Sequence, residues 1–296
     1  MPRTRPDQAE GLRRLLDRNP LRVVAISAGA GGRGKTGAII NLAGALAERG
    51  SDVLVLDENP SAQGVTAALG LKANFDLEDV IRRERDLDEV IVRGPAGIMI
   101  LPLARGARSL SQLPAREQQW LVDRCGRLGL PVDTLLVDAA PGSTSALLWF
   151  GKATQEVIVL AGGSPAAITA AYTLIKRLSG EFGRREFHIL VSDIASESAA
   201  RTIFSNMART ARRYLQVSLD FMGHIPPDDK LQHAARLQLP VVAAFPGAAA
   251  AASFRRLAQA VSDWPQSGKE GSGFDDFMRR LIHSSRAHSA AAQTSL

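Results

Sequence analysis

The stretch S-A-G-A-G-G-R-G-K-T, residues Ser27 to Thr36, decides the fold of this chain. From Gly29 onward it matches G-x-x-x-x-G-K-[ST], the pattern of a phosphate-binding loop. The β-prone run Leu21–Ile26 precedes it, and an apolar pattern of helical period follows from Gly37 to Arg49. A strand that leads through glycines into a helix can hold a polyphosphate, because backbone N–H groups converge there and the helix N-terminus adds positive potential. The pattern therefore predicts a nucleotide site.

Individual residues of this loop have expected roles. Lys35 reaches the outer phosphates and Thr36 binds Mg²⁺. The flanking strand and helix disfavour the alternative, a glycine turn without a ligand. We expect the nucleotide to be bound by Gly29, Ala30, Gly31, Gly32, Arg33, Gly34, Lys35, Thr36 and Gly37.

Two further apolar runs end in a carboxylate, Val53–Asp57 and Leu135–Asp138. Ligands of a doubly wound sheet bind at the C-terminal ends of its strands, so both carboxylates are expected near the loop. Aliphatic residues followed by Asp form the Walker B pattern, in which Asp138 would hold Mg²⁺ by way of water. Either Asp alone could equally cap a helix or turn. Together with the loop, the two runs indicate a nucleoside triphosphatase fold.

Composition is consistent with one large α/β domain with appendages. The 296 residues are 45% hydrophobic, and the single cysteine excludes a disulfide framework. No apolar run reaches the roughly 18 residues of a membrane span, and the first 20 residues lack the apolar stretch of a secretory signal. These features predict a cytoplasmic protein, soluble or peripheral to a membrane. The net charge of +6 suits an anionic partner or arginines solvated beside acids.

Strands and helices alternate along the chain, which predicts a mostly parallel, doubly wound sheet with helices on both faces. The expected strands are residues 23–27, 52–57, 98–103, 134–138, 156–161, 187–192, 219–225 and 241–244. The expected helices are residues 36–49, 115–127, 166–178, 196–215, 228–237 and 249–262. This P-loop domain should extend over residues 21–263, after an N-terminal arm of residues 1–20.

The C-terminal region predicts a flexible linker over residues 264–273, an amphipathic helix over 274–283 and a disordered tail over 284–296. Such a short helix is marginal alone. Anionic lipid, pairing of two chains or docking on the protein's own surface would complete its stabilisation. The expected membrane-facing set is Phe274, Phe277, Met278, Leu281 and Ile282, flanked by Arg279 and Arg280.

The sequence resembles the MinD/ParA family of deviant Walker ATPases over residues 21–262. The resemblance rests on the loop of the first strand, on Asn41-Leu42-Ala43 in the helix after it, and on the strand that ends in Asp57. Within that family it is similar to the flagellar-number regulators of the FlhG type, also called FleN or YlxH. The segments that carry this likeness are Asp7–Arg13, Thr169–Lys176, Ile225–Asp228 and Leu239–Val242.

This resemblance implies an ATP-binding switch with bound Mg²⁺, an ATP-dependent homodimer and a membrane-targeting C-terminal helix. It also implies that the N-terminal arm stimulates FlhF, a GTPase of the signal-recognition type, with Gln8 central. The arm residues concerned are Asp7, Gln8, Leu12 and Arg13. Further nucleotide contacts are implied at Ser192, Pro226 and Pro227, of which Ser192 replaces an asparagine that often marks adenine recognition.

Two departures from the family pattern concern hydrolysis, for which Lys35, Asp57 and position 59 are the expected catalytic positions. The family's signature lysine is Ala30 here, and its water-activating aspartate is Asn59. An amide can orient water but cannot take its proton. The sequence therefore predicts ATP binding with weak or absent turnover. The alternative is an active ParA- or MinD-type ATPase that positions cargo on DNA or a membrane.

Overall fold

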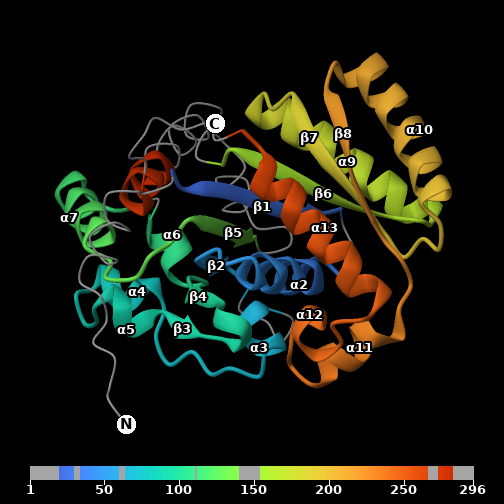
Figure 1. Ribbon diagram of the computed structural model, residues 1–296. Helices are drawn as coiled ribbons and strands as arrows, with labels where there is room; N and C mark the ends of the chain where they lie inside the picture. Colours follow the sequence, from blue (N-terminus) through green and yellow to red (C-terminus); the bar gives the residue numbers. More distant parts are fainter. Residues whose placement is uncertain are drawn as a thin grey trace, which may run out of the picture.

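The computed structural model describes residues 20–29, 34–59, 64–110, 112–139, 154–265 and 273–282. Eight strands of these residues form one sheet in the order β3-β4-β2-β5-β1-β6-β7-β8 (Figure 1). All neighbouring strands are parallel except β3 and β4. The predicted doubly wound, mostly parallel sheet is confirmed.

The strands of the centre are almost wholly buried, as expected for parallel strands covered on both faces. The strands are β1 (Arg22–Ala28), β2 (Val53–Asp57), β3 (Val92–Arg93), β4 (Met99–Pro102), β5 (Thr134–Asp138), β6 (Glu156–Gly162), β7 (Glu186–Ser192) and β8 (Ser218–Ile225).

Helices connect the strands, and polar N-caps mark the start of several. The side chains of Ser196 and Asp228 accept hydrogen bonds from the first turns of α10 and α11. The helices are α2 (Lys35–Glu48), α3 (Val65–Ala68), α4 (Leu77–Ile81), α5 (Leu87–Val90), α6 (Gly106–Leu110), α7 (Ala115–Gly126), α9 (Pro165–Phe182), α10 (Glu197–Leu215), α11 (Asp229–Arg236), α12 (Val241–Ala244) and α13 (Ala249–Asp263), with the 3₁₀ turn η1 (Pro95–Gly97).

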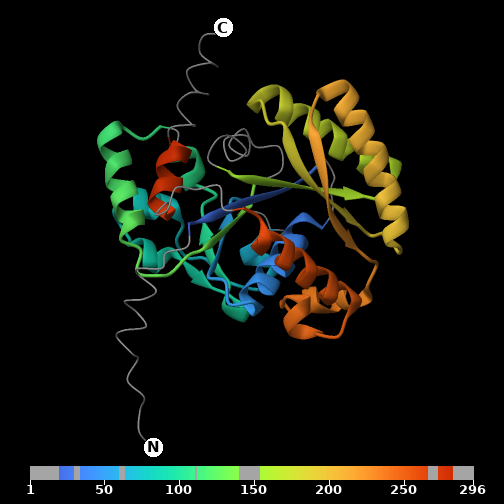
Figure 2. The same ribbon diagram turned by 45° about the horizontal axis from the view of Figure 1, so that its top comes forward.

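Two apolar clusters fill the space between the sheet and its helices. One joins a face of the sheet to α4, α5, α6, α7, α9, α10 and the helix of residues 274–282. The other joins the opposite face to α2, α3, α11, α12 and α13. Figures 1 and 2 show these two helical layers on either side of the sheet. Helices therefore cover both faces, as the alternating pattern predicts.

The strand predicted over residues 241–244 is wrong, because this segment is the short helix α12. Val241 and Val242 are buried against α2, and the Val241 N–H donates to Asn41 Oδ1 at 2.6 Å. Pro240 packs so closely over Gly44 that a Cβ there would lie 2.5 Å from Pro240 Cβ. A run of four apolar residues does not distinguish a strand from a helix by its period.

The region between β2 and α7 holds elements that the sequence pattern did not predict, namely α3, α4, α5, β3, η1 and α6. Capping boxes begin two of these helices: Asp76 with Asp79 at α4, and Asp86 with Glu89 at α5. An acid three residues after an N-cap is a readable signal even for a helix of one turn.

The C-terminal helix, defined as residues 274–282, forms as predicted and lies beside α7 (Figures 1 and 2). Its five apolar side chains are at most 6% exposed and belong to the core cluster of the α7 face. Of the alternatives left open by the sequence, docking on the protein's own surface is the one observed. Contact of these side chains with a lipid surface therefore requires the helix to leave this position.

Several predictions fall on residues outside the described ranges. These are the N-terminal arm with Asp7, Gln8, Leu12 and Arg13, the loop residues Ala30, Gly31, Gly32 and Arg33, most of the predicted linker, the last residue of the predicted C-terminal helix, residue 283, and the predicted tail of residues 284–296. Trp264, expected to begin the linker, instead packs against the core and stacks on His188 at 4.2 Å between ring centroids.

Candidate functional site

The C-terminal ends of β1, β2 and β5 meet at one edge of the sheet, because the three strands are parallel neighbours. Asp57 and Asp138 stand opposite each other in the register of β2 and β5. β1 lies beside β5 and leads through Gly29 toward the start of α2. The topology thus brings the predicted loop and both predicted carboxylates together.

Lys35 and Thr36, the first residues of α2, both contact Asp138. The Lys35 Nζ lies 2.6 Å from Asp138 Oδ1 and also donates to the carbonyl oxygen of Ala139. The Thr36 hydroxyl donates to Asp138 Oδ2 at 3.2 Å. The Asp138 side chain is fully buried and that of Lys35 is 11% exposed. The three side chains form one polar cluster at the N-terminus of α2.

Burial raises the pKa of Asp138 above its ordinary value, because the carboxylate is cut off from water. The charge of Lys35 acts in the opposite direction, and the neighbouring Asp57 adds to the rise. A cation beside Asp138 is therefore needed to keep it ionised at low energetic cost. Lys35 supplies that charge in the observed arrangement.

Asp57 is buried and held by the start of α3. Its Oδ2 accepts from the Thr66 hydroxyl at 2.6 Å and from the Thr66 N–H at 2.8 Å. Its Oδ1 accepts from the Asn59 N–H at 3.2 Å. Asp57 thus fixes the chain on both sides of residues 60–63. The sequence analysis missed Thr66, since a threonine nine residues after a strand end matches no motif.

Two glycines of the loop have positions that other residues would not tolerate. Gly34 caps α2 with φ of +93°, in the left-handed region that favours glycine. Gly29 lies against α9, where an added Cβ would be 2.2 Å from the carbonyl carbon of Ala170. The packing of α9 thus independently requires the first glycine of the motif.

Ser192 ends β7 at the same edge of the sheet, and its hydroxyl lies 3.4 Å from the Ala161 carbonyl oxygen. Pro226 and Pro227 follow β8 directly. The order β1-β6-β7-β8 separates these residues from the loop by intervening strands. They share the edge with the cluster around Asp138, and their contact with a nucleotide stays a prediction.

The donors of the cluster fit Mg²⁺ and a polyphosphate. Mg²⁺ prefers oxygen ligands, which the Thr36 hydroxyl and the Asp138 carboxylate provide. Lys35 is a cation at the helix N-terminus, where phosphate groups are favoured. Among the described residues, no helix has the length and apolar character needed to span a bilayer.

Comparison with known proteins gives three findings. The CobQ/CobB/MinD/ParA nucleotide binding domain matches residues 24–241. The antiactivator FleN of Pseudomonas aeruginosa is 34% identical over 264 residues, which cover 89% of this chain and 94% of FleN. The flagellum site-determining protein YlxH of Helicobacter pylori is 26% identical over 215 residues, 72% of each chain.

A solved structure shares the fold. MinD of Pyrococcus horikoshii, complexed with Mg-ADP, superposes with a TM-score of 0.56 at 22% identity, over 82% of this chain and 96% of that one. An identity this low bears on the fold and not on activity. Together with the observed sheet, these similarities agree with the predicted P-loop architecture.

Proposed function

Because this chain belongs to the CobQ/CobB/MinD/ParA nucleotide-binding family, we propose that it is an ATP-binding switch that regulates the number or placement of flagella. FleN, similar over nearly its whole length, is an antiactivator, and YlxH is a flagellum site-determining protein. The cluster of Lys35, Thr36 and Asp138 at the sheet edge is the observation that carries the nucleotide half of the proposal.

The cluster suggests how binding is coupled to the rest of the chain. Lys35 now neutralises Asp138, so a polyphosphate that attracts Lys35 leaves Asp138 in need of another cation. Mg²⁺, held by Thr36 and by Asp138 through water, would supply that charge and neutralise phosphate oxygens. Movement of Lys35 also frees the carbonyl oxygen of Ala139, the residue that precedes residues 140–153. Occupancy alone can therefore change the surface around the site.

Counting flagella in the native cells tests the regulatory half. Cells that carry Lys35→Ala in place of the natural chain should show an altered number or position of flagella by electron microscopy. Lys72→Ala is the matched control, since Lys72 is an exposed lysine remote from the site in sequence. A wild-type pattern of flagella in Lys35→Ala cells would contradict the proposal.

We propose further that hydrolysis is slow. Ala30 and Asn59 replace the two groups that the family uses to neutralise charge and activate water. Removal of a cation from phosphoryl transfer costs on the order of 10³–10⁵ in rate, and loss of a general base about 10²–10⁴. Steady-state turnover should lie well below about 1 s⁻¹, and a higher value would contradict this part.

The arm and the C-terminal helix are the proposed contacts with partners. Gln8 and its neighbours Asp7, Leu12 and Arg13 would stimulate an FlhF-type GTPase, which a synthetic peptide of residues 1–20 tests directly. A Gln8→Ala peptide is the control, and equal stimulation by both would contradict the role of Gln8.

The C-terminal helix would bind an anionic membrane after release from the α7 face, as part of a cytoplasmic protein at the inner face of the membrane. ATP-dependent pairing of two chains would double the number of such helices and strengthen the attachment. Co-sedimentation with anionic vesicles tests this, because the full chain carries the C-terminal helix and a chain ending at residue 265 lacks it. Equal sedimentation of both would contradict the membrane role.

A second candidate, a cargo-positioning ATPase on DNA, is favoured by the outer face of α10. Arg209, Arg212 and Arg213 are exposed there. Such a face binds phosphates without sequence preference, with an affinity that falls steeply with salt. A salt-sensitive gel shift with duplex DNA, abolished by charge reversal at these arginines, would favour this candidate over the flagellar switch.

A further inference from the structure

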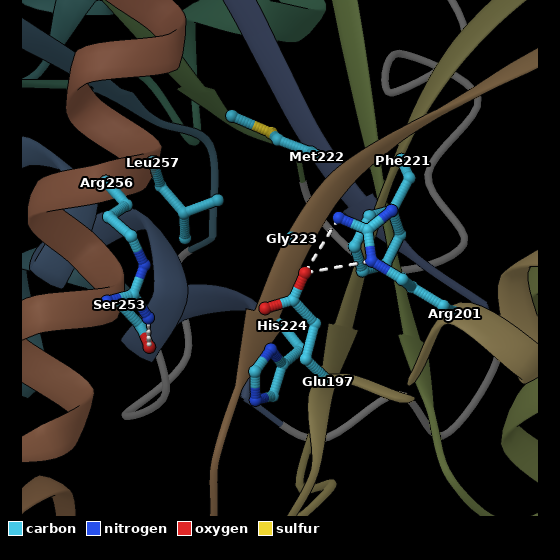
Figure 3. A pocket seen from close by; sticks show the side chains of 9 residues that line it. All are labelled: Glu197, Arg201, Phe221, Met222, Gly223, His224, Ser253, Arg256 and Leu257. Atoms are coloured by element: carbon cyan, nitrogen blue, oxygen red, sulfur yellow. Dashed lines mark hydrogen bonds and ion pairs between the residues drawn. The ribbon is translucent and has the colours of Figure 1, made fainter. Parts of the chain in front are cut away.

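A site remote from the nucleotide cluster, here called the edge-strand site, consists of the outer edge of β8 and the parts of α10 and α13 beside it. β8 ends the sheet and pairs with β7 alone among the described strands. A pocket of ≈ 190 Å³ opens between the helices along this edge (Figure 3). Small-molecule pockets usually measure about 300–1,000 Å³. The pocket therefore suits one inserted side chain better than a whole metabolite.

A β-bulge in β8 determines which side chains line the pocket. Phe221 pairs with Ile189 of β7, and Gly223 pairs with Leu190, the next residue of β7. Met222 is therefore the extra residue of the bulge. Gly223 has φ of +138°, a conformation that favours glycine. The insertion turns His224 to the α10 side, beside Glu197, instead of the α13 side (Figure 3). Bulges re-aim side chains in this way next to functional sites.

Positive charge dominates the pocket. Two guanidinium groups, those of Arg201 of α10 and Arg256 of α13, line it against a single carboxylate, Glu197, among the described lining residues, and His224 of β8 lies beside Glu197 (Figure 3). Glu197 Oε1 lies 2.7 Å from an Arg201 nitrogen, and the Arg201 guanidinium lies 4.7 Å from the centroid of the Phe221 ring. The hydrogen bond from Arg201 lowers the pKa of Glu197, and the charges of His224 and Arg256 act in the same direction.

The guanidinium group of Arg256 has N–H donors that can bind a ligand. It is exposed and donates to the hydroxyl of Ser253 at 3.0 Å, and it makes no ion pair with any residue in the described part of the chain. A guanidinium has five N–H donors and binds a carboxylate well through two of them. The pocket can therefore accept a second carboxylate beside Glu197.

We propose that the edge-strand site binds an extended, acidic segment of a partner protein, which adds a strand to β8 and places a carboxylate at Arg256. An edge strand directs alternate N–H and C=O groups away from its neighbour, and an extended chain can pair with them. Phe221 and Leu257 offer apolar contact to side chains that alternate with the acids. The chain's own N-terminal arm has more arginines than acids, so charge complementarity favours a second protein.

A set of labelled peptides that alternate glutamate with valine, isoleucine or threonine tests the proposal. Fluorescence anisotropy measures their binding to the full chain, and hydrogen exchange measures protection of residues 218–225. We expect saturable binding, slower amide exchange in β8, and affinity at least about tenfold weaker in Arg256→Glu, since a hydrogen bond to a charged group is lost. Arg256→Gln, which removes the charge without reversing it, should weaken binding less.

Arg209→Glu is the matched control, because it makes the same change of charge on the exposed surface of α10 outside the pocket. This variant should retain binding. The proposal is overturned if lysine-containing peptides of the same pattern bind equally, if Arg209→Glu and Arg256→Glu weaken binding alike, or if bound peptide leaves exchange of residues 218–225 unchanged. Failure of all acidic peptides to bind overturns it too. None of these outcomes depends on nucleotide binding, so the two proposals are tested separately.

Discussion

Replacement of Phe277 by alanine should release the C-terminal helix from the core and expose the thiol of Cys125. Phe277 is fully buried, and its ring stacks on Phe274 at 6.1 Å between centroids. The helix lies against the end of α7, where a Cβ added to Gly126 would be 3.4 Å from the Asp275 Cβ. Cys125, one residue earlier, is 2% exposed. The helix thus shields the thiol.

The free energy that holds the C-terminal helix in place follows from its burial. Five buried apolar side chains contribute on the order of 10 kcal/mol. Ordering residues 274–282 costs on the order of 10 kcal/mol. The docked state is therefore favoured over the released one by only a few kcal/mol. A buried Phe→Ala change costs about 3–5 kcal/mol, which shifts this balance by roughly two to four orders of magnitude.

Thiol reactivity toward an aromatic disulfide reports the release, because Cys125 is the single cysteine of the chain. Burial raises the pKa of Cys125 far above its ordinary range, and the charge of Asp275 adds to this effect. The reactive thiolate is thus almost absent in the docked state. We expect Phe277→Ala to react about a hundredfold faster or more than the natural chain in native buffer.

Arg279→Ala provides the control, since Arg279 is exposed on the same helix and its ion pairs with Asp275 and Asp276 lie at the surface. Such pairs contribute little, so the rate should stay near wild type. An unchanged rate in Phe277→Ala, equal acceleration in both variants, or collapse of the urea midpoint in Phe277→Ala would each refute local release of a marginal helix.

Three further predictions concern the nucleotide site. Thr66→Val should lower the free energy of unfolding by about 1.5–3 kcal/mol, because buried Asp57 loses the Thr66 hydroxyl, and an unchanged urea midpoint would contradict this. Asn59→Asp should raise ATP turnover by about 10²–10⁴ through a restored base; equal turnover would show that position 59 does not limit the rate. Burial raises the pKa of Asp138, so the folded state binds the proton of this carboxyl group more tightly than the unfolded chain does. The protonated group therefore stabilises the fold at low pH, and this contribution is lost as the pH rises through the raised pKa. Urea unfolding from about pH 4 to about pH 8 should therefore show wild-type stability falling relative to Asp138→Asn as pH rises, and a constant difference would count against it.

The parallel sheet and the core of the site could be read from sequence because their signals are local and strong. Val53–Asp57 and Leu135–Asp138 are unbroken apolar runs that end in a carboxylate, and the register places Asp57 opposite Asp138 as expected. Lys35 and Thr36 follow from a motif whose spacing is fixed by the turn that it forms. Their shared contact with Asp138 is then a consequence of topology.

Other features depend on tertiary contacts that leave no periodic trace. The apolar residues Val241 and Val242 predict a strand, but the segment forms a helix. The hydrogen bond from the Val241 N–H to Asn41 and the contact of Pro240 with Gly44 hold it there. Thr66 holds Asp57 across a loop, without any motif. The same apolar face of the C-terminal helix can pack on a lipid surface or on α7, so the sequence alone could not show which of the two it contacts.

Calorimetric titration of the full chain with ATP in the presence of Mg²⁺ tests the central claim, which is that the cluster of Lys35, Thr36 and Asp138 binds a nucleotide whose occupancy carries the signal. The account predicts saturable binding of one nucleotide per chain, strongly weakened in Lys35→Ala and retained in Lys72→Ala. Absence of binding to the natural chain, or equal affinity in Lys35→Ala, would contradict it.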